Sequence, residues 1–310
     1  MDEIVLGNGQ RTTRIAFGCG GLGGSTGWKP SRRLLAAAWD AGIRHFDVAP
    51  SYGFGEAERF LGRAIKEFGS TATVTTKVGI GRGSRPGPVG QLVRNAARVG
   101  LAAVPGLRRK LGNKMRAAAP RGQFETGFVR ASVEESLRAL GRDHIDVLLL
   151  HEAVESDLSQ ELLDLLTRLQ QEGKIGAAGV GSRIESLQAM SWPLPPPLAT
   201  AQGAWRLDGH HLAALPGVAI NRHGVVHNLP QLRAILQSNP AFAAEVSERT
   251  SLRCTEPEGA VDLLIALALS DAPDGMVIAQ SRDANRVAQL ARAREMPSAA
   301  DILVGLRGMV

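Results

Sequence analysis

The chain has 310 residues, of which 44% are hydrophobic, so it is long and apolar enough to bury a substantial core. This length fits one large domain or two ordinary ones. The formal net charge is +6, but residues 79–124 carry ten basic side chains and no acidic one, so the rest of the chain is net negative. A local basic excess of this kind can attract phosphates, carboxylates, nucleic acid or an anionic membrane.

The cysteine count and the hydropathy exclude several classes of protein. Cys19 and Cys254 are too few for a disulfide framework or a zinc ribbon. The sequence begins with Met-Asp-Glu and lacks the basic and apolar leader of a secretory signal. No apolar run approaches the roughly 18 residues of a membrane helix, since Val261–Leu269 is about half that length. We therefore expect a cytoplasmic protein without a membrane partner.

Alternating strand and helix patterns follow an N-terminal hairpin. The hairpin and the strand that it leads into are predicted from residues 4–6, a turn at residues 7–9 and residues 12–17. Seven further strands are predicted at residues 44–47, 73–77, 145–151, 175–180, 198–202, 217–221 and 276–279. Helices are predicted at residues 32–41, 56–68, 127–140, 159–172, 184–190, 258–269 and 284–294, with one or two short helices within 222–257. Ser31 is the predicted N-cap of the first helix, and Gly42 ends it. Eight alternating units predict a single α/β domain over residues 1–310, a (β/α)8 TIM barrel.

The glycine-rich stretch Gly18–Gly23 matches the pattern GxGxxG after a strand. In a Rossmann fold this pattern opens directly into a helix whose N-terminus binds phosphate. Here residues 25–30 separate the pattern from the predicted helix. We therefore favour a loop at the rim of the barrel, where small residues let a substrate or a cofactor approach the backbone.

Polar side chains stand where three consecutive predicted strands end. Asp47 ends one strand, and Tyr52 follows it in a Gly-rich loop. Lys77 ends the next strand, and His151 ends the one after that. Because parallel barrel strands end at the same rim, these four side chains indicate an active site there. Taken singly, Asp47 also fits a turn cap, and His151 also fits a hydrogen-bonded buried histidine.

Together with their neighbours, these residues resemble the aldo-keto reductase superfamily. The matching set is Phe46-Asp47, Pro50-Ser51-Tyr52-Gly53, Glu58, Leu61-Gly62, Thr76-Lys77 and Leu150-His151. The similarity runs from about Leu6 to about Arg292. It implies a (β/α)8 barrel with an N-terminal β-hairpin across its bottom and long loops at its C-terminal rim. It also implies a nicotinamide cofactor and a catalytic tetrad made of the four strand-end residues.

Carbonyl reduction needs a hydride donor and a group that protonates the carbonyl oxygen. A tyrosine has a pKa of about 10, so its phenolate is scarce near neutrality. An ammonium group beside the phenol lowers that pKa, which is the role expected of Lys77. In this scheme Asp47 keeps Lys77 charged and in place. His151 donates a hydrogen bond that orients the carbonyl oxygen beside Tyr52.

The resemblance also implies where the nicotinamide binds. Ser182 and Arg183 stand where the family has a Ser-Asn pair that contacts the nicotinamide amide, and Gln202 matches the glutamine partner of that pair. Arg183 replaces the usual Asn, so only Ser182 and Gln202 carry over.

After the last predicted strand, Ser281, Arg282 and Arg286 resemble the segment that holds the adenosine 2′-phosphate. Gln280 stands where a lysine is common in the family. Two arginines beside a helix N-terminus suit a dianionic phosphate, which favours NADPH over NADH. The same residues also fit a solvated helix start.

The basic segment 79–124 is predicted as an insertion between the third strand and the helix that follows it, at the catalytic rim. Residues 92–99 indicate a short amphipathic helix. Three roles are open: closure over an anionic substrate, binding of a partner, or a solvated loop. Nucleic acid is a poor fit, because no aromatic residue is interleaved with the charges before Phe124.

The sequence predicts an NADPH-dependent oxidoreductase that reduces an aldehyde or a ketone, or oxidises a sugar or secondary alcohol in reverse, with Tyr52 as the general acid and base. The alternative is a cofactor-binding barrel that serves as a regulatory or scaffold subunit with little turnover. The expected partner is a small carbonyl or alcohol, anionic ones included, and the expected assembly is a monomer or a small homo-oligomer. No metal is expected, because no carboxylate or thiol cluster accompanies His210, His211, His223 and His227.

Overall fold

The computed structural model describes residues 2–23, 27–69, 72–82, 121–290 and 296–309. Eight parallel strands form a closed barrel, in which the last strand pairs with the first. The barrel strands are β3 (Ile15–Gly18), β4 (His45–Asp47), β5 (Thr73–Val78), β6 (Ile145–His151), β7 (Ile175–Gly181), β8 (Leu198–Ala204), β9 (Ala219–His223) and β10 (Val277–Ala279). The predicted (β/α)8 barrel is therefore confirmed, and the strands from β4 onward lie within two residues of their predicted bounds.

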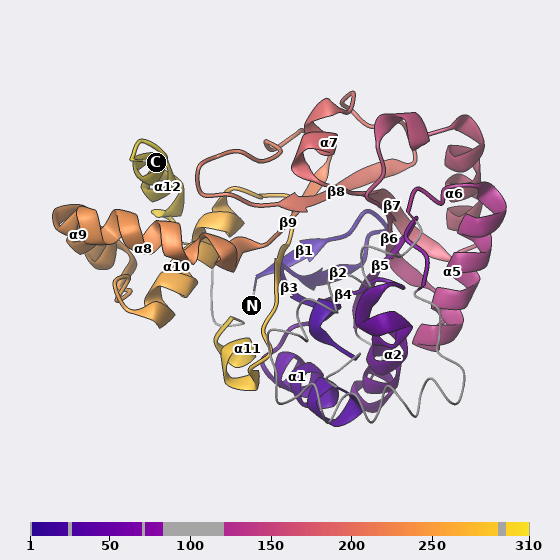
Figure 1. The fold of residues 1–310 in the computed structure, drawn as a ribbon, viewed down its shortest axis with the longest axis horizontal. Helices are drawn as coiled ribbons and strands as arrows, with labels where there is room; N and C mark the ends of the chain where they lie inside the picture. The colour runs from indigo at the N-terminus through magenta and orange to yellow at the C-terminus, as the bar shows by residue number, and fades with distance from the viewer. Residues whose placement is uncertain (1, 24–26, 70–71, 83–120, 291–295, 310) are drawn as a thin grey trace.

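Helices cover the outside of the barrel (Figure 1). Among the described residues, one helix follows each strand from β3 to β7: α1 (Trp28–Asp40), α2 (Ala57–Phe68), α5 (Thr126–Leu140), α6 (Gln160–Gln171) and α7 (Ile184–Ala189). Three helices follow β9 and two follow β10: α8 (Leu229–Ser238), α9 (Pro240–Thr250), α10 (Pro257–Ser270), α11 (Ala284–Leu290) and α12 (Ala299–Arg307). In Figure 1, α8, α9 and α12 lie on one side of the barrel, away from α5 and α6.

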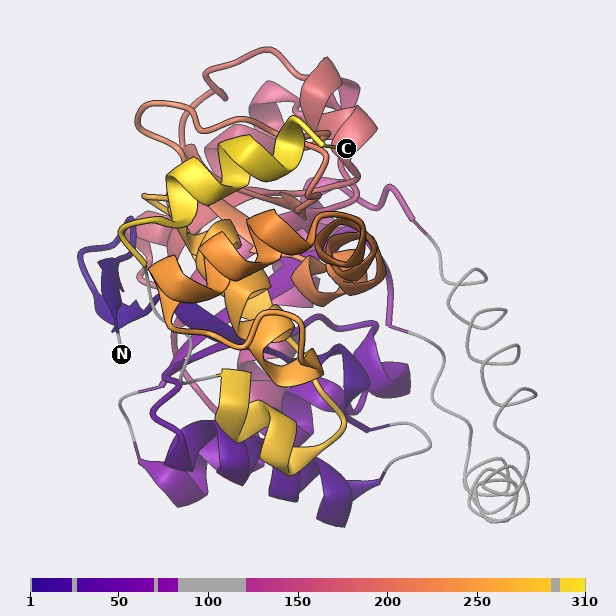
Figure 2. The ribbon, with the colours of Figure 1, turned by 90° about the vertical axis from the view of Figure 1, so that its left-hand side faces the viewer.

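A two-stranded hairpin precedes the barrel, as predicted. Its strands β1 (Glu3–Val5) and β2 (Arg11–Thr13) are antiparallel, and β3 begins two residues after β2. Figure 2 shows the hairpin beside the N-terminus at the edge of the molecule. Leu6 packs with buried residues of the barrel strands, among them Ala16 and Val147. The hairpin therefore lies at the end of the barrel where the strands begin, and it does not cover the opposite end.

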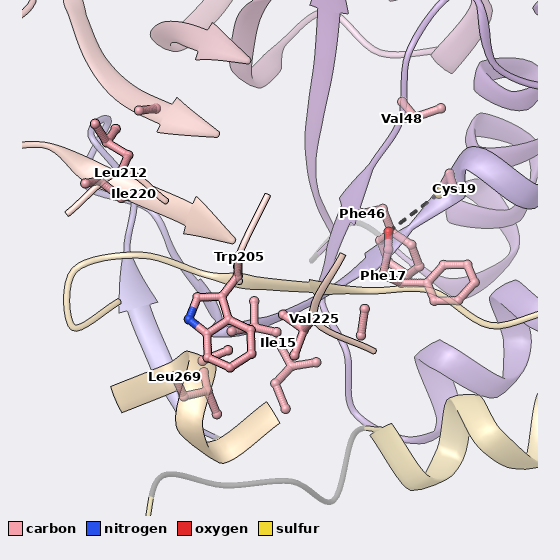
Figure 3. Packing of buried hydrophobic residues seen from close by; sticks show 14 of the residues in the cluster. Ile15, Phe17, Cys19, Phe46, Val48, Trp205, Leu212, Ile220, Val225 and Leu269 are labelled. Atoms are coloured by element: carbon pink, nitrogen blue, oxygen red, sulfur yellow. Dashed lines mark hydrogen bonds between the residues drawn. The ribbon is translucent and has the colours of Figure 1, made fainter. Parts of the chain in front are cut away.

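The apolar core lies between the barrel strands and the helices (Figure 3). Phe17 on β3 and Phe46 on β4 are partners in the parallel ladder, and their rings meet edge to face with centroids 6.4 Å apart. Trp205, which follows β8, is buried near Ile15 and Val225. Outward-facing apolar side chains of this kind hold the helices on a barrel whose strands are short.

The first helix begins earlier than predicted. α1 starts at Trp28 with Gly27 as its N-cap, so the prediction that Ser31 caps the helix is wrong. The Ser31 hydroxyl instead donates to the carbonyl oxygen of Gly27 at 2.6 Å and accepts from the backbone N–H of Gly23 at 3.0 Å. Pro30 lies within the first turn, where its missing N–H has no helical partner to lose. Ser31 therefore ties the glycine-rich loop to the first turn of the helix.

The C-terminal helix α12 was not predicted. Nη2 of Arg307 donates to Oδ2 of Asp271 at 3.0 Å, which fixes the end of α12 to the loop before β10. The same oxygen accepts from Nε1 of Trp205 at 2.9 Å and lies 2.5 Å from Nε2 of His211. Burial alone would raise the pKa of Asp271, but hydrogen bonds and charge from His211, Arg307 and Trp205 lower it to about 2.

Most of the predicted basic insertion, residues 83–120, lies outside the described residues, and so does the helix predicted within 92–99. The chain that follows it is described. Phe124 is buried, and a Cβ added to Gly79 would collide with its ring. The backbone N–H of Gln123 donates to the carbonyl oxygen of Gly79 at 3.1 Å. The segment that returns from residue 120 is thus anchored on the end of β5.

Candidate active site

A cavity of about 650 Å³ opens at the C-terminal ends of the barrel strands. Each of the eight strands contributes a lining residue, and the turn after β4 contributes Tyr52. In chain order the strand residues include Gly18, Asp47, Lys77, His151, Gly181, Gln202, His223 and Ala279. Active sites of (β/α)8 barrels lie at this end, because the loops that follow the strands meet there.

Lys77 and Asp47 form a buried ion pair in the cavity. Nζ of Lys77 donates to both carboxylate oxygens of Asp47, each at 2.7 Å, and to the carbonyl oxygen of Val48 at 3.1 Å. The two side chains are only 2% and 5% exposed. Burial alone would lower the pKa of Lys77, but the charges of Asp47 and Tyr52 and hydrogen bonds with both raise it above its ordinary value of 10.5. Lys77 is therefore a fixed positive charge at neutral pH.

Tyr52 stands beside both Lys77 and His151. Nζ of Lys77 lies 5.2 Å from the centroid of the Tyr52 ring. Tyr52 begins the 3₁₀ turn Tyr52–Gly55, in which Gly53 and Phe54 both have a φ of 58°. A Cβ on Gly53 would collide with the carbonyl group of Leu22, so this turn requires glycine there. The turn holds the phenol in the cavity next to the end of β5.

His151 is the last residue of β6 and lines the cavity. Burial, followed by the positive charges of Lys77 and Arg121, lowers the pKa of His151 to about 3. The imidazole is therefore neutral near pH 7. A neutral imidazole carries one N–H donor and one lone pair, so His151 can donate a hydrogen bond to an oxygen atom without bringing a second positive charge beside Lys77.

A histidine braces the two strands that carry the ion pair. His45 precedes Asp47 by two residues on β4, and its ring nitrogens lie 2.8 Å from Oγ1 of Thr73 and 2.8 Å from Oγ1 of Thr75 on β5. Both threonines face the same way as Lys77, since side chains alternate along a strand. His45 is fully buried, and this burial is the main reason that its pKa falls to about 4. The His45 imidazole is therefore neutral, and it lies directly below the Lys77–Asp47 pair.

Ser182 and Gln202 lie on the other side of the barrel. Ser182 donates from its hydroxyl to the carbonyl oxygen of Ala153 at 2.7 Å and from its backbone N–H to the carbonyl oxygen of Gln202 at 3.1 Å. Gln202 lines the cavity and is buried, yet Oε1 of its side chain has no hydrogen-bond partner among the described residues. Buried amide oxygens are normally paired. An amide donor bound in the cavity would satisfy this one, so the site fits a nicotinamide carboxamide.

Part of the segment after β10 also lines the cavity. Ser281 and Arg282 line the cavity, whereas Arg286 lies on α11 with an exposed side chain and does not. The structure thus brings Asp47, Tyr52, Lys77, His151, Ser182, Gln202, Ser281 and Arg282 into one cavity and leaves Arg286 outside its lining.

The glycine-rich loop after β3 makes room for Gln280. A Cβ on Gly20 would lie 3.2 Å from Oε1 of Gln280, and one on Gly21 would lie 3.0 Å from its Nε2. Gly20 and Gln280 both line the cavity. The glycines of the GxGxxG pattern therefore allow the loops after β3 and β10 to approach each other closely.

The sequence matches the family model described as the aldo/keto reductase family over residues 14–207. The chain belongs to this family. Asp47, Tyr52, Lys77 and His151 all lie within the matched residues, and all four line the cavity.

Curated members of the family match part of the chain. A D-threo-aldose 1-dehydrogenase of a Pseudomonas species is 35% identical over 159 residues, which is 49% of this chain and 43% of the relative. The aldo-keto reductase YhdN of Bacillus subtilis is 29% identical over 209 residues, which is 66% of this chain and 53% of the relative. The matches thus span about half the length of these relatives.

Solved structures of the family share the fold over almost the whole chain. An aldo-keto reductase of Bacillus halodurans has a TM-score of 0.68 at 19% identity, covering 99% of this chain and 96% of the other. A glycerol dehydrogenase of Gluconobacter oxydans has a TM-score of 0.68 at 21% identity, covering 98% and 94%.

The lining residues that were not predicted as site residues include two ionisable ones beside the strand ends, His223 and Glu152. His223 ends β9, and burial is the main reason that its pKa is lowered. The strand-end rule that found Lys77 and His151 would have found it, had the strand not been predicted to end at residue 221. Glu152 also lines the cavity, but it follows His151 directly, and the strand-end rule selected only the last residue of that strand.

Within the described parts of the chain, no three His, Cys, Asp or Glu side chains gather closely enough to hold a metal ion. Of the helices that the structure describes, none has the length and apolar character needed to cross a membrane.

Proposed function

We propose that this chain is an NADPH-dependent oxidoreductase that reduces an aldehyde or a ketone, or oxidises the corresponding alcohol in reverse. The observation that carries the proposal is the grouping of Tyr52, the buried Lys77–Asp47 pair and a neutral His151 in one cavity. This combination provides a proton donor, a fixed cation and a hydrogen-bond donor around one oxygen atom.

Each of the four residues has a separate task in this proposal. The Tyr52 hydroxyl gives its proton to the carbonyl oxygen and takes it back in the reverse direction. The Lys77 ammonium stabilises the phenolate that remains, and Asp47 holds that ammonium charged and in place. The imidazole N–H of His151 donates to the carbonyl oxygen and orients it. A bound nicotinamide supplies the hydride, or accepts it in the reverse reaction.

The cavity lining and the family pattern support a set of cofactor-binding residues. Gln202 offers its unpaired Oε1 to the carboxamide, and Ser182 lies beside it. Ser281 and Arg282 contact the phosphates at the open side of the cavity, and Arg286 reads the 2′-phosphate that distinguishes NADPH from NADH. A relative in Escherichia coli, 29% identical over 198 residues, is named an NADH-specific methylglyoxal reductase, so the family membership alone does not decide between the two cofactors.

A second function is a cofactor-binding subunit without much turnover. A Schizosaccharomyces pombe relative, 30% identical over 147 residues, is named a putative voltage-gated potassium channel subunit beta. The buried ion pair beside Tyr52 favours catalysis, because two charges are costly to bury and the cavity uses both.

The test is turnover by the purified chain. NADPH is incubated with the protein and a panel of aldehydes, ketones and sugars, and its oxidation is followed by absorbance. We expect at least one substrate to turn over at about 1 s⁻¹ or faster, which is ordinary for an enzyme. Tight NADPH binding without oxidation above the protein-free rate would support the regulatory subunit instead.

A further inference from the structure

Arg222 is a fully buried cation on the outer side of the barrel. It belongs to β9, and its side chain points away from the cavity, because side chains alternate along a strand and the next residue, His223, lines the cavity. Its Nη2 donates to the carbonyl oxygen of Asp271 at 3.3 Å. Its Nε and Nη1 are buried without a partner among the described residues. Buried donors are normally paired, and a buried charge without a counter-charge is costly.

Arg307, the last residue of α12, brings a second guanidinium group to the same place. Its Nη2 donates to Oδ2 of Asp271 at 3.0 Å, and α12 packs beside α10, which ends next to Asp271 (Figure 1). The Nε of Arg307 is also buried and has no partner in the described parts of the chain. A Cβ on Gly209 would lie 3.4 Å from this Nε, so the glycine leaves room beside the guanidinium.

The two guanidinium groups share one carboxylate. Asp271 is the acidic residue that contacts both side chains, and its Oδ2 also contacts Trp205 and His211. His211 adds no negative charge in either protonation state. Burial is the main reason that the pKa of Arg222 falls to about 10, so this guanidinium keeps its charge near pH 7. The cluster therefore has more positive than negative charges, and three of its guanidinium nitrogens are unpaired.

We propose that Arg222 and Arg307 bind a small monovalent inorganic anion, chloride in its simplest form, between β9 and the ends of α10 and α12. An anion supplies the missing negative charge and accepts from several N–H groups at once, and hydrogen bonds of this charged kind are the strong ones. A water molecule would pair the donors but would leave the charge uncompensated.

The enclosure of the site selects small anions. Arg222 is fully buried, and the Arg307 side chain is 31% exposed, so a bulky anion would have to displace the end of α12 to enter. The binding groups come together only when β9, α10 and α12 have packed. An anion bound there favours the folded protein over the unfolded chain, and such a ligand raises the melting temperature.

The experiment is thermal unfolding at constant ionic strength, with sodium chloride replacing sodium gluconate, whose anion is too bulky for the site. We expect the wild-type Tm to rise with chloride and to level off as the site fills. With a Kd of about 1 mM, about 100 mM chloride should raise the Tm on the order of 5 °C. The line width of the chlorine NMR signal measures binding without unfolding, and we expect excess broadening that bromide suppresses.

Two variants and one control locate the anion. Arg222→Met removes the buried charge, and an apolar replacement of a buried ion is often tolerated. We expect this variant to lose both the chloride-dependent rise in Tm and the excess line broadening. Arg307→Gln, on the partly exposed side of the site, should weaken chloride binding by about 10-fold to 100-fold. Arg206→Gln is the control, because Arg206 pairs with Asp208 at 2.9 Å on the surface, and it should respond to chloride as the wild type does.

Two results would overturn the inference. Equal Tm values in chloride and gluconate, without excess broadening, would show that no anion is bound. A full chloride response in Arg222→Met would place the anion elsewhere, since this variant keeps every other basic residue of the chain. If Arg222→Met does not fold, Arg307→Gln decides, and a wild-type chloride affinity in that variant would refute the site.

Discussion

The rings of Tyr52 and His151 meet edge to face, with their centroids 6.3 Å apart and their planes at 86°. The two side chains come from different strand ends, so the barrel closure brings them together. In the proposed reaction each directs one hydrogen atom at the carbonyl oxygen, from the phenol and from the neutral imidazole. Because Lys77 supplies the charge, neither ring has to be ionised before the reaction begins.

Tyr52→Phe should abolish most of the turnover. The change removes the proposed proton donor and leaves the ring, so the cavity keeps its shape. A positioned acid commonly contributes about 10²-fold to 10⁴-fold, and we expect a loss in kcat of that size. NADPH affinity, measured by fluorescence titration, should change by less than about twofold. Turnover at the wild-type rate in the pure variant would refute the role of Tyr52.

Arg286→Ala should weaken NADPH far more than NADH, because only NADPH carries the 2′-phosphate. A lost charge-assisted contact is worth about 1.5–3 kcal/mol, or roughly one to two decades in affinity. Arg282→Ala is the matched variant, since Arg282 lines the cavity while Arg286 does not. It should weaken both cofactors to a similar extent. If Arg286→Ala also weakens both equally, Arg286 does not read the phosphate.

The buried His45 should make the protein less stable in acid. Its pKa is lowered from 6.5 to about 4, first by burial, so below pH 6.5 the unfolded chain binds a proton that the folded protein does not. Its contribution to stability is complete above about pH 6.5 and is lost as the pH falls toward 4. The full loss is on the order of 3 kcal/mol. Urea unfolding at pH 7 and pH 4.5 measures it, and His45→Gln should show a smaller difference. Identical pH dependence in both proteins would contradict this account.

Gly62→Ala should destabilise the fold. Gly62 lies in α2 where it crosses the end of α5, and an added Cβ would collide with the backbone of Leu140. Overpacking of this kind costs about 1–3 kcal/mol. Gly305→Ala is the control, because its Cβ would meet only the Phe242 ring, at 3.2 Å, which can turn aside. Thermal unfolding should show a clear loss for the first variant and a smaller change for the second.

The strand ends were predictable because the signal is local. Asp47 and His151 each end a strand, Lys77 stands one residue before the end of β5, and the parallel barrel brings these strand ends together. The contact between Glu152 and Arg121 could not be read from the sequence, because the two residues are 31 positions apart and meet only in the folded chain. The helix α12 was missed because its position is fixed by Asp271, a contact that exists only in the folded chain.

The family pattern also had limits that the structure explains. Arg286 was predicted from the family motif, and its side chain is exposed on α11 and outside the cavity lining. The Ser31 cap failed because Gly27 starts the helix one turn earlier.

The tetrad comes from β4, β5 and β6, whereas the proposed cofactor residues come from β7, β8 and the segment after β10. If the proposed roles hold, the chain is divided in sequence into a part that does the chemistry and a part that holds the coenzyme, with the turn around residues 155–159 between them. Cutting the gene there would give two fragments that each lack something essential. Expressed as fusions to two interacting proteins, such fragments would report that interaction as NADPH oxidation.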